Sequence, residues 1–583
     1  MSQSEDLSVR LRADALHPPY YGLPSSEYDN DNDALAPIDE TPTHATLPER
    51  KRNQGLGLLR TSALLNTYAP INLLPVELLA SILCSVQDGY LHSKTPAGRL
   101  QWLSTLLVCR HWFVVAATTP RIWCDVVVTG RCLEYFRTAL ARSKSVHISV
   151  SVTGRCYRVD EALELLTPHV HRISGLLLQV SGPSNVSLLI AFLQHCMPAL
   201  SSISFAISCI HPNRDEVVID LPPQRFPKLQ AVSLNAIYLC PSTIYKQLTC
   251  LELNGWHRSM QPELTLDTLT MIVQACASSI QELNIVKMAC HSPTDHHSAF
   301  TARVERVAMP CLRRLSFRKT ESLTVKHLLS VLALPPTARL TVQGRGFNSH
   351  TQDLIQGFRA LIPQDRSGLP LLSHLTHAEA CLYDGSRKLV ACSSTPCGDS
   401  SPSPTLDLQI SCYNPGGIAE PPLSDDVLDI LRTAPLEHLR IELPAHGIVR
   451  VDWTAMFLPF PQLRHLAICG IGTHDDAVPI YKSLTPCLMP DSGTSPEECL
   501  LLPKLRSLRI EGFDAGNYLP IALKVVLEDR ISCLGRAGAL DELYFQLDNH
   551  RSGEHFEDRR AAYSEFFGSS VQTLVYVPGK PDW

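Results

Sequence analysis

The pattern L-x-x-L-x-L, in which apolar residues follow one another at spacings of three and two, recurs along this chain of 583 residues. Such a recurrence constrains the fold strongly, because a structural repeat can bury its apolar face only against its neighbours. Chance produces isolated copies in any leucine-rich chain, but here ten copies lie mostly 27 to 35 residues apart, and three share a lead-in of Met or Phe followed by Pro. The copies are Ile173/Leu176/Leu178, Leu200/Ile203/Phe205, Leu229/Val232/Leu234, Leu248/Leu251/Leu253, Ile280/Leu283/Ile285, Leu312/Leu315/Phe317, Leu436/Leu439/Ile441, Leu463/Leu466/Ile468, Leu505/Leu508/Ile510 and Leu540/Leu543/Phe545.

Each copy predicts a short strand whose alternating apolar residues point to one face. Helix-like stretches lie between copies, for example at 264–276 and 323–332. Stacking these units predicts an α/β solenoid with parallel strands on a broad concave face and helices on the convex face. The spacing leaves open whether this solenoid is single or split. Polar stretches near 384–405 and 485–499 predict loops inserted into the array.

A different pattern precedes the repeats. Apolar residues at positions 74, 78, 79, 82, 83 and 86 form one helical stripe, and Pro75 suits the first turn of such a helix. After a polar insert at 87–101, apolar residues between Leu103 and Ala117 predict a second helix that Pro120 ends. The run at 126–128 then predicts a short strand.

These two predicted helices carry apolar residues on more than one side. Part of the stripe must be ordinary core of a helical domain, because a domain of about fifty residues has little core to spare. The apolar residues in excess of that core favour a surface for a partner protein.

The helical segment resembles an F-box, and the repeats resemble the irregular leucine-rich repeats that follow the F-box in many fungal F-box proteins. The residues that carry the first resemblance are, in order, Leu74-Pro75, Glu77-Leu78-Leu79, Ile82-Leu83, Leu107-Val108-Cys109-Arg110-His111-Trp112, Ala116-Ala117, Pro120 and Trp123. The insert at 87–101 is longer than a compact F-box needs. The resemblance implies a small helical F-box domain at 67–130 and an irregular leucine-rich-repeat domain at 131–583.

The resemblance also implies a function. The F-box would bind the Skp adaptor of an SCF-type cullin ubiquitin ligase, the repeats would bind an unidentified substrate protein, and the chain itself would not be an enzyme. It would act by holding a substrate lysine near an activated ubiquitin. The alternative is a leucine-rich-repeat scaffold whose F-box-like helices only cap the solenoid. The residues expected at the Skp interface are Leu74, Pro75, Leu78, Leu79, Ile82, Leu83, Leu107, Val108, Trp112 and Trp123.

Charge argues against nucleic acid as a partner. The net charge is -6, and the first fifty residues hold ten acidic residues and three arginines, so the remainder carries 48 basic and 47 acidic residues. Residues 1–66 have little apolar periodicity and predict a disordered acidic tail. The twenty cysteines are spread singly through apolar segments, and no run reaches 18 apolar residues. Charged residues from Glu5 to Arg12 lie where a signal peptide would need an apolar run. We therefore expect a soluble protein of the cytoplasm, the nucleus or both, with no membrane partner.

Motifs of catalysis and cofactor binding are absent. The sequence has no G-x-S-x-G, H-E-x-x-H or G-x-x-x-x-G-K-[ST] motif and no pair of C-x-x-C motifs. Cys290, His291, His296 and His297 gather in a polar stretch and are interpreted as a loop rather than a metal site. The pairs Asp425-Asp426 and Asp475-Asp476 are interpreted as helix caps or solvated faces rather than catalytic carboxylates. We expect no cofactor and no metal.

Overall fold

In the computed structural model of the chain, the described residues run from 56 to 578 with several gaps. The gaps are 59–60, 63, 92–95, 129–132, 153–157, 182, 209–217, 236–237, 240–242, 256–265, 289–305, 346–356, 384–385, 394–404, 412–422, 444–450, 473, 486–500, 515–517, 549–555 and 569. Residues 1–55 of the predicted tail and the predicted loop at 486–499 lie outside the described residues. The described residues form two compact units, which meet in the sequence at residues 229 and 230.

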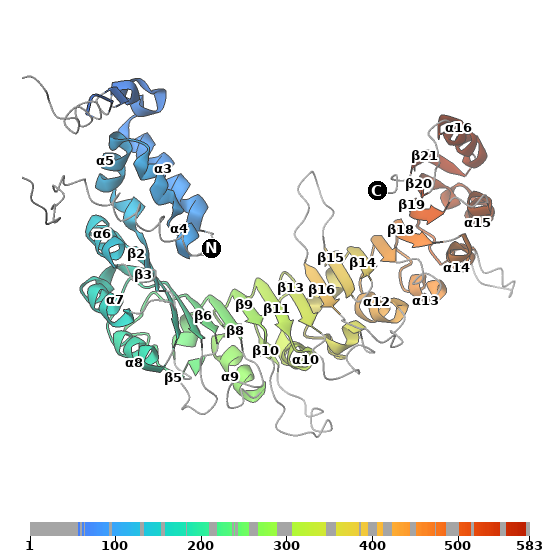
Figure 1. Ribbon diagram of the computed structural model, residues 1–583. Coiled ribbons are helices and arrows are strands. Elements are labelled where there is room, and N and C mark those ends of the chain that lie inside the picture. The colour runs from blue at the N-terminus through green and yellow to red at the C-terminus, as the bar shows by residue number, and fades with distance from the viewer. Residues whose placement is uncertain are drawn as a thin grey trace, which may run out of the picture. The chain divides into compact units, whose positions relative to one another are not determined.

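The first unit begins with short helices and continues into a parallel sheet (Figure 1). Its strands β1, β2, β3 and β4 pair in chain order, and all three pairings are parallel. Helix α6 packs on β1 and α8 on β3. The elements are η1 (Pro70–Leu73), α3 (Val76–Leu91), α4 (Pro96–Arg99), η2 (Gln101–Leu107), α5 (Arg110–Thr118), η3 (Pro120–Trp123), β1 (Asp125–Val128), α6 (Glu134–Arg142), β2 (Ile148–Val152), α7 (Val159–Leu166), η4 (Thr167–Arg172), β3 (Ile173–Ser181), α8 (Pro183–Phe192), β4 (Ser202–Ser208) and β5 (Val218–Ile219).

The second unit is also mixed α/β, with a larger and mostly parallel sheet. Its strands lie in the spatial order β6, β8, β9, β11, β13, β16, β15, β14, β17, β18, β19, β20 and β21. The elements are β6 (Ala231–Asn235), β7 (Tyr238–Leu239), η5 (Thr243–Gln247), β8 (Cys250–Asn254), α9 (Leu266–Cys276), β9 (Glu282–Val286), β10 (Val307–Ala308), β11 (Arg314–Thr320), α10 (Ser322–Val331), β12 (Leu332–Ala333), β13 (Arg339–Arg345), η7 (Gly357–Ala360), η8 (Pro370–His374), β14 (His377–Tyr383), β15 (Ser386–Cys392), β16 (Leu406–Ser411), α12 (Leu423–Leu431), β17 (His438–Leu443), α13 (Trp453–Phe457), β18 (His465–Gly472), α14 (His474–Leu484), β19 (Ser507–Asp514), α15 (Tyr518–Leu534), η10 (Gly535–Gly538), β20 (Leu540–Asp548), α16 (Phe556–Phe567) and β21 (Val571–Pro578).

The ten predicted strands are confirmed as parallel strands. Each L-x-x-L-x-L copy coincides with one of β3, β4, β6, β8, β9, β11, β17, β18, β19 and β20, and each of their apolar residues is at most 3% exposed. Helices cover this buried face, since α10 contacts β11, α14 contacts β18 and α16 contacts β21 (Figure 1). Burial of one such side chain contributes about 1.5–3 kcal/mol, so these rows are the main source of cohesion in both units.

The sheet of the second unit has one antiparallel strand among the described residues. Strand β15 lies inside the segment 384–405, where a loop was predicted, and pairs antiparallel with both β14 and β16. Strand β16 then lies parallel to β13, and β14 lies parallel to β17. The parallel order therefore resumes on each side of the β14–β15–β16 meander.

A buried ion pair fixes β15 beneath the helices. Arg387 of β15 and Asp426 of α12 pair with side chains that are 4% and 1% exposed. Asp426 also accepts a hydrogen bond from the backbone N–H of Phe358, and a Cβ on neighbouring Gly357, whose φ is +57°, would overlap its carboxylate. The interpretation of Asp426 as a cap or solvated acid is wrong, because its partner Arg387 comes from a strand that the sequence pattern did not reveal. Burial raises the pKa of Asp426 to about 6, and Arg387 opposes that rise.

Replacing Asp426 with Asn should destabilise the second unit by about 3–5 kcal/mol, because Arg387 would stay buried without a counter-charge. The double variant Arg387→Met/Asp426→Leu should recover most of that loss. Urea unfolding of the full chain measures both effects, and Asp425→Asn is the matched control, since Asp425 is an exposed acid on the same helix. Equal unfolding midpoints for Asp426→Asn and Asp425→Asn would contradict a structural role for the pair.

Candidate functional site

Helix α3 presents one apolar face to solvent and buries the other. Leu78 and Ile82 are 53% and 37% exposed, whereas Leu79 and Leu83 are 0% and 1% exposed. The exposed face lines a pocket of about 510 Å³, formed by Leu74, Leu78, Ser81, Ile82, Ser85 and Val86. An apolar helix face of this kind is suited to bind a partner protein.

The helix predicted between Leu103 and Ala117 is two elements. Helix η2 ends at Leu107, and α5 begins after Cys109, whose backbone is extended with φ −161°. At this break Leu107 and Val108 are 57% and 58% exposed. The insert predicted at 87–101 is likewise partly helical, because α3 continues to Leu91 and α4 follows.

Two tryptophans hold these short helices together. The Trp112 ring N–H donates to Oδ1 of Asn72 at 2.8 Å, which ties α5 to η1. Trp123 is completely buried: its ring N–H donates to the Ala116 carbonyl at 2.7 Å, and the Arg142 guanidinium lies 4.7 Å from its ring centroid. The sequence did not predict this role of Asn72, because a single Asn before a helix does not indicate that a distant indole will donate a hydrogen bond to it.

The structure divides the ten residues expected at the Skp interface. The five that are exposed are Pro75, Leu78, Ile82, Leu107 and Val108. Leu74 and Trp112 are half-buried. Leu79, Leu83 and Trp123 are buried in the core. An apolar stripe alone does not say which of its residues the neighbouring helices cover.

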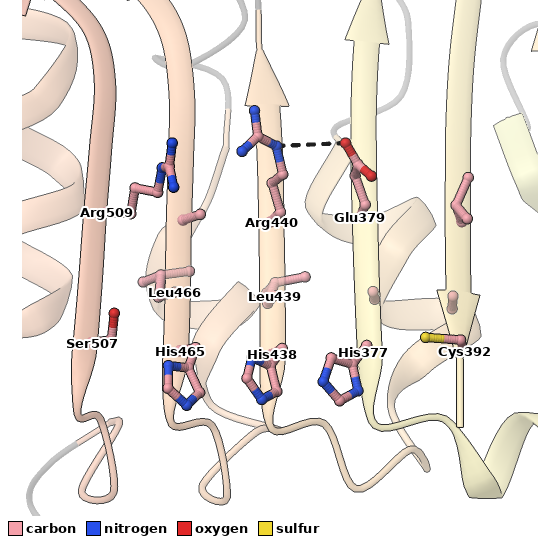
Figure 2. Close-up of a pocket in the computed structure, with 14 residues that line it drawn as sticks. His377, Glu379, Cys392, His438, Leu439, Arg440, His465, Leu466, Ser507 and Arg509 are labelled. Atoms are coloured by element: carbon pink, nitrogen blue, oxygen red, sulfur yellow. Dashed lines mark ion pairs between the residues drawn. The ribbon is translucent and has the colours of Figure 1, made fainter. Parts of the chain in front are cut away.

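A second candidate site lies on the face of the second unit's sheet that the helices leave uncovered. Side chains from β14, β15, β17, β18 and β19 line a pocket of about 420 Å³ there (Figure 2). Its most regular feature is a row of three histidines, His377, His438 and His465, in the same register on neighbouring parallel strands. We call them the histidine row.

The three imidazole rings of the histidine row stack face to face. The ring centroids of His377 and His438 are 4.0 Å apart at an interplanar angle of 13°, and those of His438 and His465 are 4.0 Å apart at 7°. Strand spacing in a sheet is about 4.8 Å, so side chains that share a register and a rotamer must stack. Figure 2 shows the three rings at one level across the strands.

Charged side chains form the next level of the pocket. Arg440 reaches Glu379 on one side at 3.5 Å and Glu511 on the other at 3.4 Å, passing the small side chain of Ala467. Arg509 pairs with Glu511 and lies 3.9 Å from the Tyr544 ring centroid. Both arginines therefore have carboxylate partners, which makes this level a poor site for a phosphate group.

The pKa values of the histidines and of Cys469 in this region are shifted so that the neutral form of each side chain is favoured. Burial, and then the neighbouring histidines and Arg464, lower the pKa of His438 to about 4; burial also lowers the pKa values of His377 and His465. Burial and the bond that its thiol donates to Glu511 raise the pKa of Cys469 to about 12. At neutral pH this cysteine is a thiol, which is not the nucleophilic form.

One other group of potential ligands appears among the described residues. Glu379, Cys381 and Glu442 place their ligand atoms within 4.8 Å of one another. The stretch Cys290 to His297 lies outside the described residues. Asp475-Asp476 lies in α14.

Comparisons with known proteins add no assignment: no family model matches the chain, and no curated protein matches it. No helix in the described part of the chain combines the length and apolar character that a membrane span requires.

The histidine row predicts acid sensitivity of the second unit. An unfolded His titrates near pH 6.5, whereas the pKa of His438 in the folded chain is about 4, so protons favour the unfolded state as the pH falls from 6.5 toward 4. The unfolding midpoint in urea should drop between pH 7.5 and 5. This drop should be smaller in His438→Gln than in wild type. In the control His374→Gln, which replaces an exposed histidine, the drop should be as large as in wild type. Identical pH dependence in wild type and His438→Gln would contradict this.

Proposed function

We propose that this chain is the substrate-recognition subunit of an SCF-type ubiquitin ligase. In this proposal residues 67–130 are an F-box that binds the Skp adaptor, and the strand and helix units after them are an irregular leucine-rich-repeat solenoid that binds a substrate protein. The observation that carries the proposal is the exposed apolar surface of Leu78, Leu107 and Val108 on helices whose opposite side is already buried. Apolar surface of this extent on so small a helical segment is typical of a binding site.

The charged and polar groups support a binding role. The arginines of the candidate pocket are paired with carboxylates, its histidines have lowered pKa values, and nearby Cys469 keeps its proton in a bond to Glu511. Within the proposal, catalysis belongs to a ubiquitin-conjugating enzyme in the assembly, and this chain acts by raising the effective concentration of substrate beside it. The proposed location is the cytoplasm, the nucleus or both.

The structure changes which residues we assign to the contact. Pro75, Leu78, Ile82, Leu107 and Val108 supply the apolar surface. Leu74 and Trp112 lie at its margin, and the bond from Trp112 to Asn72 holds α5 in place. Leu79, Leu83 and Trp123 act only indirectly, by packing the helices beneath that surface.

Co-purification of the full chain with a recombinant Skp adaptor tests the proposal. Leu78→Asp/Val108→Asp should weaken binding by roughly 30-fold or more, the equivalent of about 2 kcal/mol at an anchor residue. The matched control is Ile521→Asp/Val525→Asp on α15, because these two residues are each 51% exposed, close to the 53% and 58% of Leu78 and Val108. Thermal unfolding of all three proteins checks that the fold is kept.

Folded wild-type protein that does not bind the adaptor would overturn the proposal and favour the scaffold alternative. One observation fits that alternative: η3 leads directly into β1, and the Ser149 N–H donates to the Cys124 carbonyl at 2.9 Å, so these helices do adjoin the strands of the first unit. Equal binding by the two double variants would instead move the adaptor contact away from α3 and η2.

A further inference from the structure

We propose that the histidine row binds one transition-metal cation between adjacent imidazoles, either the pair His377 and His438 or the pair His438 and His465. Zn²⁺ is the probe for this class of ion. The inference does not depend on the adaptor proposal, because it concerns a different surface and is tested without any partner protein.

The spacing of the histidine row suits such an ion. Zn–N bonds are about 2.0–2.1 Å, so two nitrogens on a tetrahedral ion lie roughly 3.4 Å apart. The facing rings have centroids 4.0 Å apart in both pairs. Because the stacked rings are nearly parallel, their nitrogen lone pairs are parallel too, and binding requires two of the side chains to rotate until their ring planes tilt toward one ion. The strands that carry them need not move.

The second nitrogen of His377 is already held. Its Nδ1 lies 2.8 Å from the Thr376 hydroxyl, and its Nε2 is buried with no hydrogen-bond partner among the described residues. Ligand histidines in metal sites typically use one nitrogen for the metal and the other for an orienting partner. A buried ring nitrogen without a partner costs free energy, which binding of a cation would recover.

The chemistry of the donors selects the class of ion. The row offers imidazole nitrogens and no carboxylate, and imidazole suits Zn²⁺, Cu²⁺ and Ni²⁺ rather than Mg²⁺ or Ca²⁺. A metal requires imidazole in its neutral form, and burial already favours that form in all three residues. The pocket beside the row leaves space for water to fill the remaining coordination positions.

Position in the row gives each histidine a distinct expected effect. His438 belongs to both pairs, so only one ion can bind in the row at a time and His438→Gln removes both pairs at once. His377→Gln and His465→Gln each leave one pair intact. Loss of ring stacking is also greatest for His438, so the metal-free unfolding midpoints of the three variants are compared alongside their Zn²⁺ affinities to separate a ligand role from a structural one.

Isothermal titration of the full chain with Zn²⁺ tests this, together with the Zn²⁺-induced rise in the thermal unfolding midpoint. All proteins compared carry Cys290→Ser, His291→Gln, His296→Gln and His297→Gln, which removes other potential ligands in one stretch of the sequence. We expect one Zn²⁺ per chain and a loss of affinity of more than about tenfold in His438→Gln, since even indirect partners of a ligand contribute 10- to 100-fold. His377→Gln and His465→Gln should retain binding with a smaller loss.

Two control variants should leave Zn²⁺ binding unchanged. His374→Gln replaces an exposed histidine outside the row and should bind Zn²⁺ as the parent protein does. Cys381→Ala disrupts the neighbouring group of Glu379, Cys381 and Glu442 and should also leave binding unchanged. The proposal is overturned if His438→Gln binds Zn²⁺ as tightly as His374→Gln, or if Cys381→Ala abolishes binding while His438→Gln does not.

Discussion

The parallel register between neighbouring strands is the constraint on which the rest of this structure depends. Once Leu439 aligns with Leu466 and Leu466 with Leu508, the remaining residues of these strands are also aligned in rows across the sheet. One set of rows is apolar and lies under the helices, where burial stabilises the units. The alternate set faces away from the helices, and the same register that builds the core also stacks the histidines and aligns the charges of Arg440 and Arg509.

Much of this could be predicted where large apolar side chains mark a strand. The ten repeat copies show the pattern because Leu, Ile or Phe occupies nearly all of their buried positions. The β14–β15–β16 meander lacks that signal: the buried residues of β14 include Ala378 and Ala380, and β15 buries the charged Arg387. Alanine and arginine do not indicate a buried strand, so neither the meander nor the ion pair of Arg387 with Asp426 could be predicted from the sequence.

The histidine row of the candidate pocket could in part be predicted by aligning the sequence repeats. His438 and His465 each occupy the position just before the second apolar residue of a predicted copy, and a parallel register must place equivalent positions side by side. His377 bears the same relation to Ala378, but that copy is hidden by its alanines. The charged level above could not be predicted in the same way, because Arg440 contacts Glu511 from two strands away, across Ala467. Such a contact depends on side-chain length and on the small residue between, not on the repeat.

The helices of the first unit follow a different rule, and this explains why their surface was harder to assign. A strand has two faces, so alternation alone separates covered from uncovered residues, whereas a helical stripe can be divided anywhere along its width by the helices packed against it. Trp123 decides the division here, because an indole bonded to the Ala116 carbonyl and stacked beneath Arg142 fixes how η3, α5 and α6 approach one another. Leu79 and Leu83 then face inward, and Leu78 and Ile82, one position earlier along the same helix, remain outside. The exposed apolar surface is therefore a consequence of a well-packed core rather than of a poorly packed one.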